Sequence, residues 1–217
     1  MKPRVKVCCI SSKEEAQLAI HYGASAIGLV GKMPSGPGVI NDKLIYEIAR
    51  NVPPPIGTFL LTSETTFENI LEHHLIAQTN TIQLVDAISI EALKKIRIAL
   101  PGIKLVQVIH VINEESVAEA IQISEYVDAI LLDSGNPNLK IKELGGTGKV
   151  HNWKLSRKIR ESIQIPVFLA GGLNPENVNQ AIQEVEPFGL DVCSGIRNDG
   201  KLDKIKLESF MKNIDKA

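Results

Sequence analysis

The feature that most constrains the fold is a regular alternation of short, β-branched apolar runs with longer segments of helical periodicity. We interpret eight such runs as strands, at residues 5–10, 26–30, 57–62, 81–85, 104–111, 127–133, 166–171 and 188–194. The intervening helices are expected at 13–22, 41–51, 66–77, 89–99, 114–124, 153–162, 175–184 and 203–214. Eight successive strand-helix units predict an α/β fold, a single closed (β/α)8 TIM barrel of parallel strands.

The length and charge of the chain agree with one barrel that binds a small molecule. Its 217 residues suit a single domain over 1–217, and the GxGxxG turn typical of an open doubly wound sheet is absent after the first strand. A net charge of -1 provides no basic field for nucleic acid or an anionic membrane. No segment resembles a signal peptide or the ~20 apolar residues of a membrane span. We therefore expect a cytoplasmic protein.

Cysteine and histidine usage argues against disulfides and metals. The three cysteines are an odd number and two are adjacent, which favours a reduced compartment over a disulfide framework. The five histidines lack the spacing of a metal site, and no CxxC pair occurs. His110 ends a strand and is either a spare acid-base group or a simple hydrogen-bonding residue. His73 and His74 are expected on a solvated helix surface.

The first strand carries a candidate base, because catalytic groups of a barrel gather where strands end. Side chains alternate along a strand, so Lys6 and Cys8 are predicted to point into the barrel. Val5, Val7 and Cys9 would then pack against the helices. The Lys6 ammonium would favour the Cys8 thiolate, although a buried, inert cysteine is the alternative.

Two aspartates end later strands. Asp133 closes an otherwise apolar run, where burial beneath a substrate would raise its pKa and make it a general acid; a strand-end cap is the alternative. Asp191 either meets the substrate or is satisfied internally. Asp128 begins the same strand as Asp133 on the opposite face and is assigned a structural role.

Glycine-rich turns provide candidate phosphate contacts. GGTGK at 145–149 is not a Walker A loop, but the backbone at Gly145, Gly146 and Gly148 could approach an anion as part of a lid, or form an ordinary flexible loop. The last two strands end in AGGLNPENV and DVCSGI, and the final loops of barrels commonly bind phosphate. Their expected contacts are Gly171, Gly172, Ser194 and Gly195. Asn174, before Pro175, is expected to cap a helix.

Together, KVCCIS, LLDS, GGTGKVHNW, LAGGLNPENV and DVCSGI resemble the phosphoribosylanthranilate isomerases of tryptophan biosynthesis, in order and over nearly the whole chain. The resemblance implies a (β/α)8 barrel that performs a cofactor-free Amadori rearrangement of an aldose-ketose type. It implies that Cys8 is the general base and Asp133 the general acid. The substrate phosphate would rest on the GGL and SG turns, with GGTGK closing over it.

The chain departs from the family pattern at several positions. Cys9 replaces a glycine, and Gly38 replaces the arginine associated with the anthranilate end of the substrate, so Lys32 or Arg197 would have to supply the cation. The family's QLHG is QLVD here, with Val85 at the histidine position, and its SSG is CSG at Cys193. Two alternatives stay open: an isomerase of another phosphorylated aminosugar or ketose, and a non-catalytic binder of a phosphorylated metabolite. The expected assembly is a monomer or homodimer.

Overall fold

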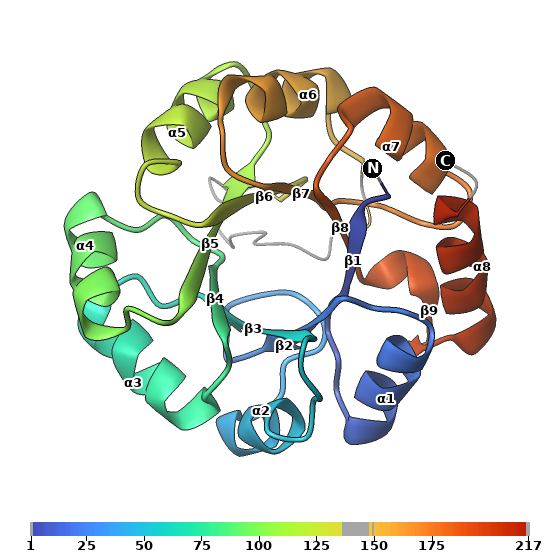
Figure 1. Cartoon of the computed structure of the whole chain (residues 1–217), viewed down its shortest axis with the longest axis horizontal. Helices are drawn as coiled ribbons and strands as arrows, with labels where there is room; N and C mark the ends of the chain where they lie inside the picture. Colours follow the sequence, from blue (N-terminus) through green and yellow to red (C-terminus); the bar gives the residue numbers. More distant parts are fainter. Residues whose placement is uncertain (1, 136–147, 149, 216–217) are drawn as a thin grey trace.

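The computed structural model describes residues 2–135, 148 and 150–215, and its strands form the predicted closed parallel barrel in the order β1 to β8 (Figure 1). The strands are β1 (Arg4–Val7), β2 (Ala26–Val30), β3 (Gly57–Thr62), β4 (Thr81–Leu84), β5 (Lys104–His110), β6 (Ala129–Asp133), β7 (Val167–Leu169) and β8 (Gly189–Val192). Pairing of β1 with both β2 and β8 closes the ring. The predicted fold class is confirmed.

Helices surround the strands on the outside of the ring (Figure 1). They are α1 (Lys13–His21), α2 (Asp42–Ala49), α3 (Phe67–Ala77), α4 (Ile90–Ala99), α5 (Glu115–Ile123), α6 (Trp153–Ser162), α7 (Val178–Val185) and α8 (Lys204–Ile214). Side-chain caps explain where several begin, since Ser12, Asn41 and Ser89 accept hydrogen bonds from the first turns of α1, α2 and α4. A 3-10 turn η1 (Ser194–Ile196) and a hairpin of β9 (Arg197–Asn198) and β10 (Lys201–Leu202) precede α8. Among the described residues, no helix is both long and apolar enough to span a membrane.

Alternation along the strands separates two apolar layers. Val5, Val7 and their equivalents pack between strands and helices, whereas Phe59, Val106 and Phe168 belong to the layer inside the barrel. The Phe168 ring makes an edge contact with Phe59 at 6.1 Å between ring centroids. Because Phe59 and Phe168 lie near the starts of their strands, they fill the amino-terminal end of the barrel. The open end is therefore where the strands finish.

Asp128 has the predicted structural role. Its carboxylate accepts hydrogen bonds from Arg97 Nη2 at 2.6 Å, Lys104 Nζ at 3.2 Å and the Leu105 backbone N-H at 2.8 Å. These contacts connect α4 with the starts of β5 and β6, far from the strand ends.

The prediction of a solvated surface for His73 and His74 is wrong, since only 9% and 5% of these residues are exposed. His73 Nδ1 lies 2.9 Å from Thr62 Oγ1, and its Nε2 lies 3.2 Å from Asp42. A Cβ at Gly31 would lie 2.4 Å from the His73 ring, so the ring fills space that this glycine leaves free. Packing of α3 against α2, β3 and the turn after β2 thus buries a helix face whose polar residues suggested exposure to solvent.

The start of α7 also differs from the prediction. Asn174 Oδ1 accepts hydrogen bonds from the backbone N-H groups of Glu176 and Asn177, at 3.0 and 2.9 Å. It therefore caps a turn that precedes the helix, and α7 begins at Val178.

Candidate active site

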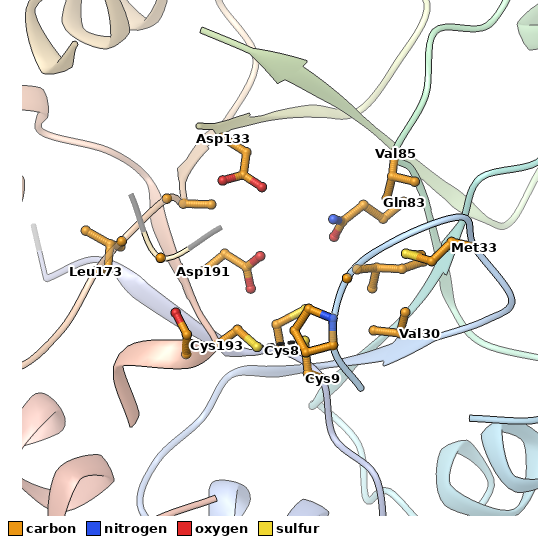
Figure 2. Close-up of a pocket in the computed structure, with 18 of the residues that line it drawn as sticks. Cys8, Cys9, Val30, Met33, Gln83, Val85, Asp133, Leu173, Asp191 and Cys193 are labelled. Atoms are coloured by element: carbon orange, nitrogen blue, oxygen red, sulfur yellow. Dashed lines mark hydrogen bonds between the residues drawn. The ribbon is translucent and has the colours of Figure 1, made fainter. Parts of the chain in front are cut away.

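A pocket opens at the carboxyl ends of the strands, and it contains both predicted proton-transfer residues (Figure 2). Its walls are formed by Cys8, Cys9, Val30, Met33, Ser35, Gly36, Pro37, Leu61, Gln83, Val85, Asp133, Gly148, Ala170, Gly171, Gly172, Leu173, Asp191, Cys193 and Ser194. Figure 2 shows the Asp133 carboxylate and the Gln83 amide pointing into the same space from different strands. Closure of the barrel thus brings the ends of β1 and β6 to one cavity.

An ion pair lies beneath this pocket. Lys6 and Asp191 are direct neighbours in the register of β1 and β8, and Lys6 Nζ donates to Asp191 Oδ1 at 2.8 Å. The Lys6 side chain is 0% exposed. Burial by itself lowers the pKa of Lys6, but the Asp191 carboxylate and the Cys8 sulfur raise it above its ordinary value. Asp191 is therefore satisfied internally while it also lines the pocket, and its contact with the substrate stays a prediction.

The Cys8 side chain points into the barrel, as alternation predicts. A Cβ at Gly28 would lie 2.8 Å from Cys8 Sγ and 3.0 Å from Lys6 Nζ, so this glycine of β2 provides the space for both groups. The pKa of Cys8 is lowered, first by a hydrogen bond from Cys9 and then by Lys6, against the opposing effects of burial and the Asp191 charge. The site therefore makes Cys8 easier to ionise than an ordinary thiol.

The predicted outward position of Cys9 is wrong. Strand β1 ends at Val7, and Cys9 adopts a left-handed backbone with φ 61°, which turns its side chain into the pocket. Arg197 stabilises this turn, because its Nη2 donates to the carbonyls of Cys8 and Cys9 at 3.2 and 2.7 Å. Alternation failed here because it holds only while the chain remains an extended strand.

Asp133 is a buried carboxyl at the end of β6. It is 8% exposed, and burial raises its pKa to about 6 despite a hydrogen bond from the Ser134 backbone N-H to Oδ1 at 2.7 Å. The nearby Asp191 charge contributes to this rise. A carboxyl with this pKa can hold a proton at a pH where an ordinary aspartate is ionised.

The glycine turns after β7 and β8 form another wall. Gly171 and Gly172 have φ values of 81° and 64°, and both line the pocket with Ser194 and Gly148. Gly195 is not among the residues that line the pocket. A Cβ there would lie 2.0 Å from the Leu173 carbonyl oxygen, so a glycine at this position lets the loop after β8 approach the loop after β7. Gly145 and Gly146 lie outside the described residues.

The opposite wall is largely apolar, and the sequence analysis singled out only Val85 among its residues. It combines Val30, Met33, Leu61 and Val85, with the Gln83 amide between them. Gln83 Oε1 is buried without a hydrogen-bond partner in the described part of the chain. The signal in the sequence was a glutamine inside an apolar strand, where an amide is unfavourable unless it finds a partner.

No lysine or arginine is among the described residues that line the pocket. Arg197 donates instead to Glu15 Oε1 at 3.0 Å and to the Cys8-Cys9 turn, and Lys32 is exposed outside the pocket wall. Gly38 has φ 77°, and a Cβ added to it would lie 2.5 Å from Cys9 Cβ. Cys9 thus occupies the space that a side chain at position 38 would need.

We expect Gly38→Ala to lower the free energy of unfolding by about 1 to 3 kcal/mol, because the methyl group meets Cys9 and the left-handed backbone disfavours it. Cys9→Gly should relieve part of this cost, since it removes the atom that the methyl group meets. Urea denaturation of the wild type, both single variants and the double variant measures the coupling. Strictly additive effects would contradict the contact.

His110 has the hydrogen-bonding role rather than a position in the pocket wall. Its Nε2 lies 3.2 Å from the Val85 carbonyl oxygen, and burial lowers the pKa of its ring. Within the described ranges, no group of three or more histidine, cysteine, aspartate or glutamate residues is arranged to hold a metal ion.

Comparison with known proteins identifies similar chains over nearly the full length. The family model described as N-(5'-phosphoribosyl)anthranilate (PRA) isomerase matches residues 5–213. A protein named N-(5'-phosphoribosyl)anthranilate isomerase 2, from Methanosarcina mazei, is 36% identical over 212 residues, which are 96% of this chain and 92% of that protein. The isomerase of Methanosarcina acetivorans is 33% identical, covering 99% of this chain and 94% of its own.

Solved structures agree with these sequence matches. Phosphoribosylanthranilate isomerase from Thermotoga maritima superposes with a TM-score of 0.84 at 32% identity, over 99% of this chain and 100% of its own. Another similar structure, with a TM-score of 0.81 and 30% identity over 99% of this chain and 100% of its own, contains reduced 1-(o-carboxyphenylamino)-1-deoxyribulose 5-phosphate. A further Thermotoga maritima structure, 29% identical with a TM-score of 0.81 over the same shares of both chains, is described as monomers generated from a dimeric isomerase.

Proposed function

The chain belongs to the N-(5'-phosphoribosyl)anthranilate isomerase family, and on this premise we propose that Cys8 and Asp133 are the base and acid of its reaction. The enzyme catalyses an intramolecular isomerisation in tryptophan biosynthesis, from N-(5'-phosphoribosyl)anthranilate to 1-(2-carboxyphenylamino)-1-deoxyribulose 5-phosphate. The observation that carries the assignment is the shared pocket, in which a thiol with a lowered pKa and a carboxyl with a raised pKa face one cavity.

The proposed reaction needs one proton donor and one proton acceptor. Asp133 protonates the ribose ring oxygen, the bond from this oxygen to C1' breaks, and the aniline nitrogen lone pair forms an iminium ion. The Cys8 thiolate then removes the C2' proton to give an enolamine, which tautomerises to the ketone. Burial of Asp133 keeps its proton available, while the hydrogen bonds from Cys9 and Lys6 keep Cys8 ready to accept one.

The pocket walls suggest how the substrate is oriented. We propose that the phosphate rests on the turns at Gly171, Gly172 and Ser194, where left-handed glycines let the backbone approach an anion closely. The aromatic ring would then lie against Met33, Leu61 and Val85. A cytoplasmic location and a monomeric or homodimeric state also remain proposals for this chain.

The purified protein should convert N-(5'-phosphoribosyl)anthranilate directly. The loss of substrate fluorescence measures this conversion. Expression in a tryptophan auxotroph that lacks this isomerase provides the cellular test. Folded protein that neither turns over the substrate nor restores growth would contradict the function. Activity confined to another phosphorylated aminosugar would contradict the anthranilate specificity and leave a related isomerase.

The activity should depend on pH through both groups. We expect kcat/KM to be bell-shaped, because Cys8 must be ionised and Asp133 protonated, and one of its two limbs should break near pH 6, where Asp133 titrates in the free enzyme. In Asp133→Asn the residual kcat/KM should rise with pH to a plateau without a descending limb, since only Cys8 still titrates. Steady-state rates measured from pH 5 to about 9 check this. A pH profile of kcat/KM that still has two limbs in Asp133→Asn would contradict the assignment of Asp133 as the acid.

A further inference from the structure

Cys9 and Cys193 place two free thiols in contact on the pocket wall (Figure 2). Their sulfurs are 2.7 Å apart, although 184 positions separate them in the chain. The contact arises because β1 and β8 are neighbours where the barrel closes, and each cysteine lies just beyond the end of its strand. Two loops from opposite ends of the sequence therefore bring a pair of oxidisable groups together.

Buried charge holds this pair in place. Arg197 lies four residues after Cys193 and donates to the Cys9 carbonyl at 2.7 Å, while its other nitrogen donates to Glu15 at 3.0 Å. Arg197 is 8% exposed, so solvent weakens these contacts little. A disulfide bond is about 2.05 Å long, and the two sulfurs need to approach by only about 0.7 Å to form one.

We propose that Cys9 and Cys193 form a reversible modification site that takes thiol oxidants such as hydrogen peroxide or small disulfides. Cys193 is the more exposed of the two and would react first. Its thiolate attacks one peroxide oxygen, the O-O bond breaks, and a sulfenic acid and hydroxide form. The Cys9 sulfur then attacks the Cys193 sulfur, displacing hydroxide. In sum, two thiols and one peroxide give one disulfide and two waters.

This disulfide would act on the neighbouring base. In the reduced protein the Cys9 thiol provides the hydrogen bond that contributes most to lowering the pKa of Cys8. Contacts with Cys193 and Cys8, together with burial, raise the pKa of Cys9, so Cys9 keeps the proton that it donates. A Cys9 sulfur in a disulfide has no hydrogen to donate. Loss of a hydrogen bond to a charged group predicts a roughly 10- to 100-fold fall in kcat/KM.

The test compares the wild type with Cys193→Ser and Cys9→Gly after treatment with peroxide. The glycine variant suits the left-handed backbone at position 9, and serine is nearly isosteric with cysteine, so both should fold. We expect the wild type to lose the mass of two hydrogens, to yield a cross-linked peptide of Cys9 with Cys193, and to recover its rate with dithiothreitol. Neither variant should form the cross-link. Peroxide should lower the rate of each variant much less than it lowers the rate of the wild type.

A wild type without this cross-link, or one that links Cys8 to Cys9 instead, would overturn the site. A Cys193→Ser variant whose rate is as sensitive to peroxide as that of the wild type would overturn the effect on rate, because oxidation of Cys8 alone would then explain the loss. The effect on rate rests on the proposed role of Cys8, whereas the cross-link does not. A cross-link with an unchanged rate would therefore support the modification site and contradict the contribution of the Cys9 hydrogen bond to the reactivity of Cys8.

Discussion

Asp133→Asn is expected to lower kcat by ~10²- to 10⁴-fold, the usual contribution of a positioned general acid. Asparagine keeps the size of the side chain and can still accept the hydrogen bond from the Ser134 N-H, but it has no proton to give to the ribose ring oxygen. Calorimetric binding of the reaction product separates this effect from recognition. Product affinity should change much less than kcat, and parallel losses of both would mean that Asp133 only shapes the pocket.

The same substitution should stabilise the folded protein at neutral pH. Burial raises the pKa of Asp133 from 3.8 to about 6, so between these values the folded state binds the proton more tightly than the unfolded state does. Stability from this group is therefore present below pH 3.8 and is lost as pH rises through about 6. Two pKa units correspond to about 3 kcal/mol, an upper value for the gain in Asp133→Asn at pH 7.

Thermal unfolding at two pH values checks this linkage. The Tm of the variant should exceed that of the wild type at pH 7, and the difference should shrink towards zero as the pH approaches 4. Equal Tm values at neutral pH would show that the ionised carboxylate carries no penalty, and would remove the physical basis for its raised pKa.

Cys8→Ala is expected to reduce kcat by a similar ~10²- to 10⁴-fold, because the variant lacks the thiolate proposed as the general base. Cys8→Ser should be nearly as inactive, since a hydroxyl of the same shape remains protonated and is a poor base. Release of tritium to water from substrate labelled at C2' isolates the step assigned to Cys8. The release should be lost in both variants.

Cys9→Gly provides the matched control for this prediction. It removes a neighbouring thiol and the hydrogen bond to Cys8, but leaves Cys8 and Lys6 in place. Its kcat should fall by roughly 10- to 100-fold at most, which is the value of one hydrogen bond to a charged group. If Cys9→Gly proved as damaging as Cys8→Ala, the base would have to be reassigned to the thiol pair.

Local sequence patterns were sufficient to predict the structure wherever the chain forms regular strands and helices. β-Branched runs and helical periodicity predicted the barrel, and strand alternation placed Lys6 and Cys8 inside it. The end of an apolar strand likewise marked Asp133 as a candidate. These predictions depend on short-range geometry, which repeats along the sequence and can be counted from it.

Only the tertiary structure decided the contacts between distant segments. The left-handed turn at Cys9, the choice of Asp191 as partner of Lys6 and the burial of His73 each depend on which strands and helices become neighbours. The sequence by itself determined the barrel and the strand ends that carry the chemistry, because period and polarity are properties of each segment. Closure of the ring determined which groups meet, since the energy of a buried charge or thiol is set by its neighbours in space.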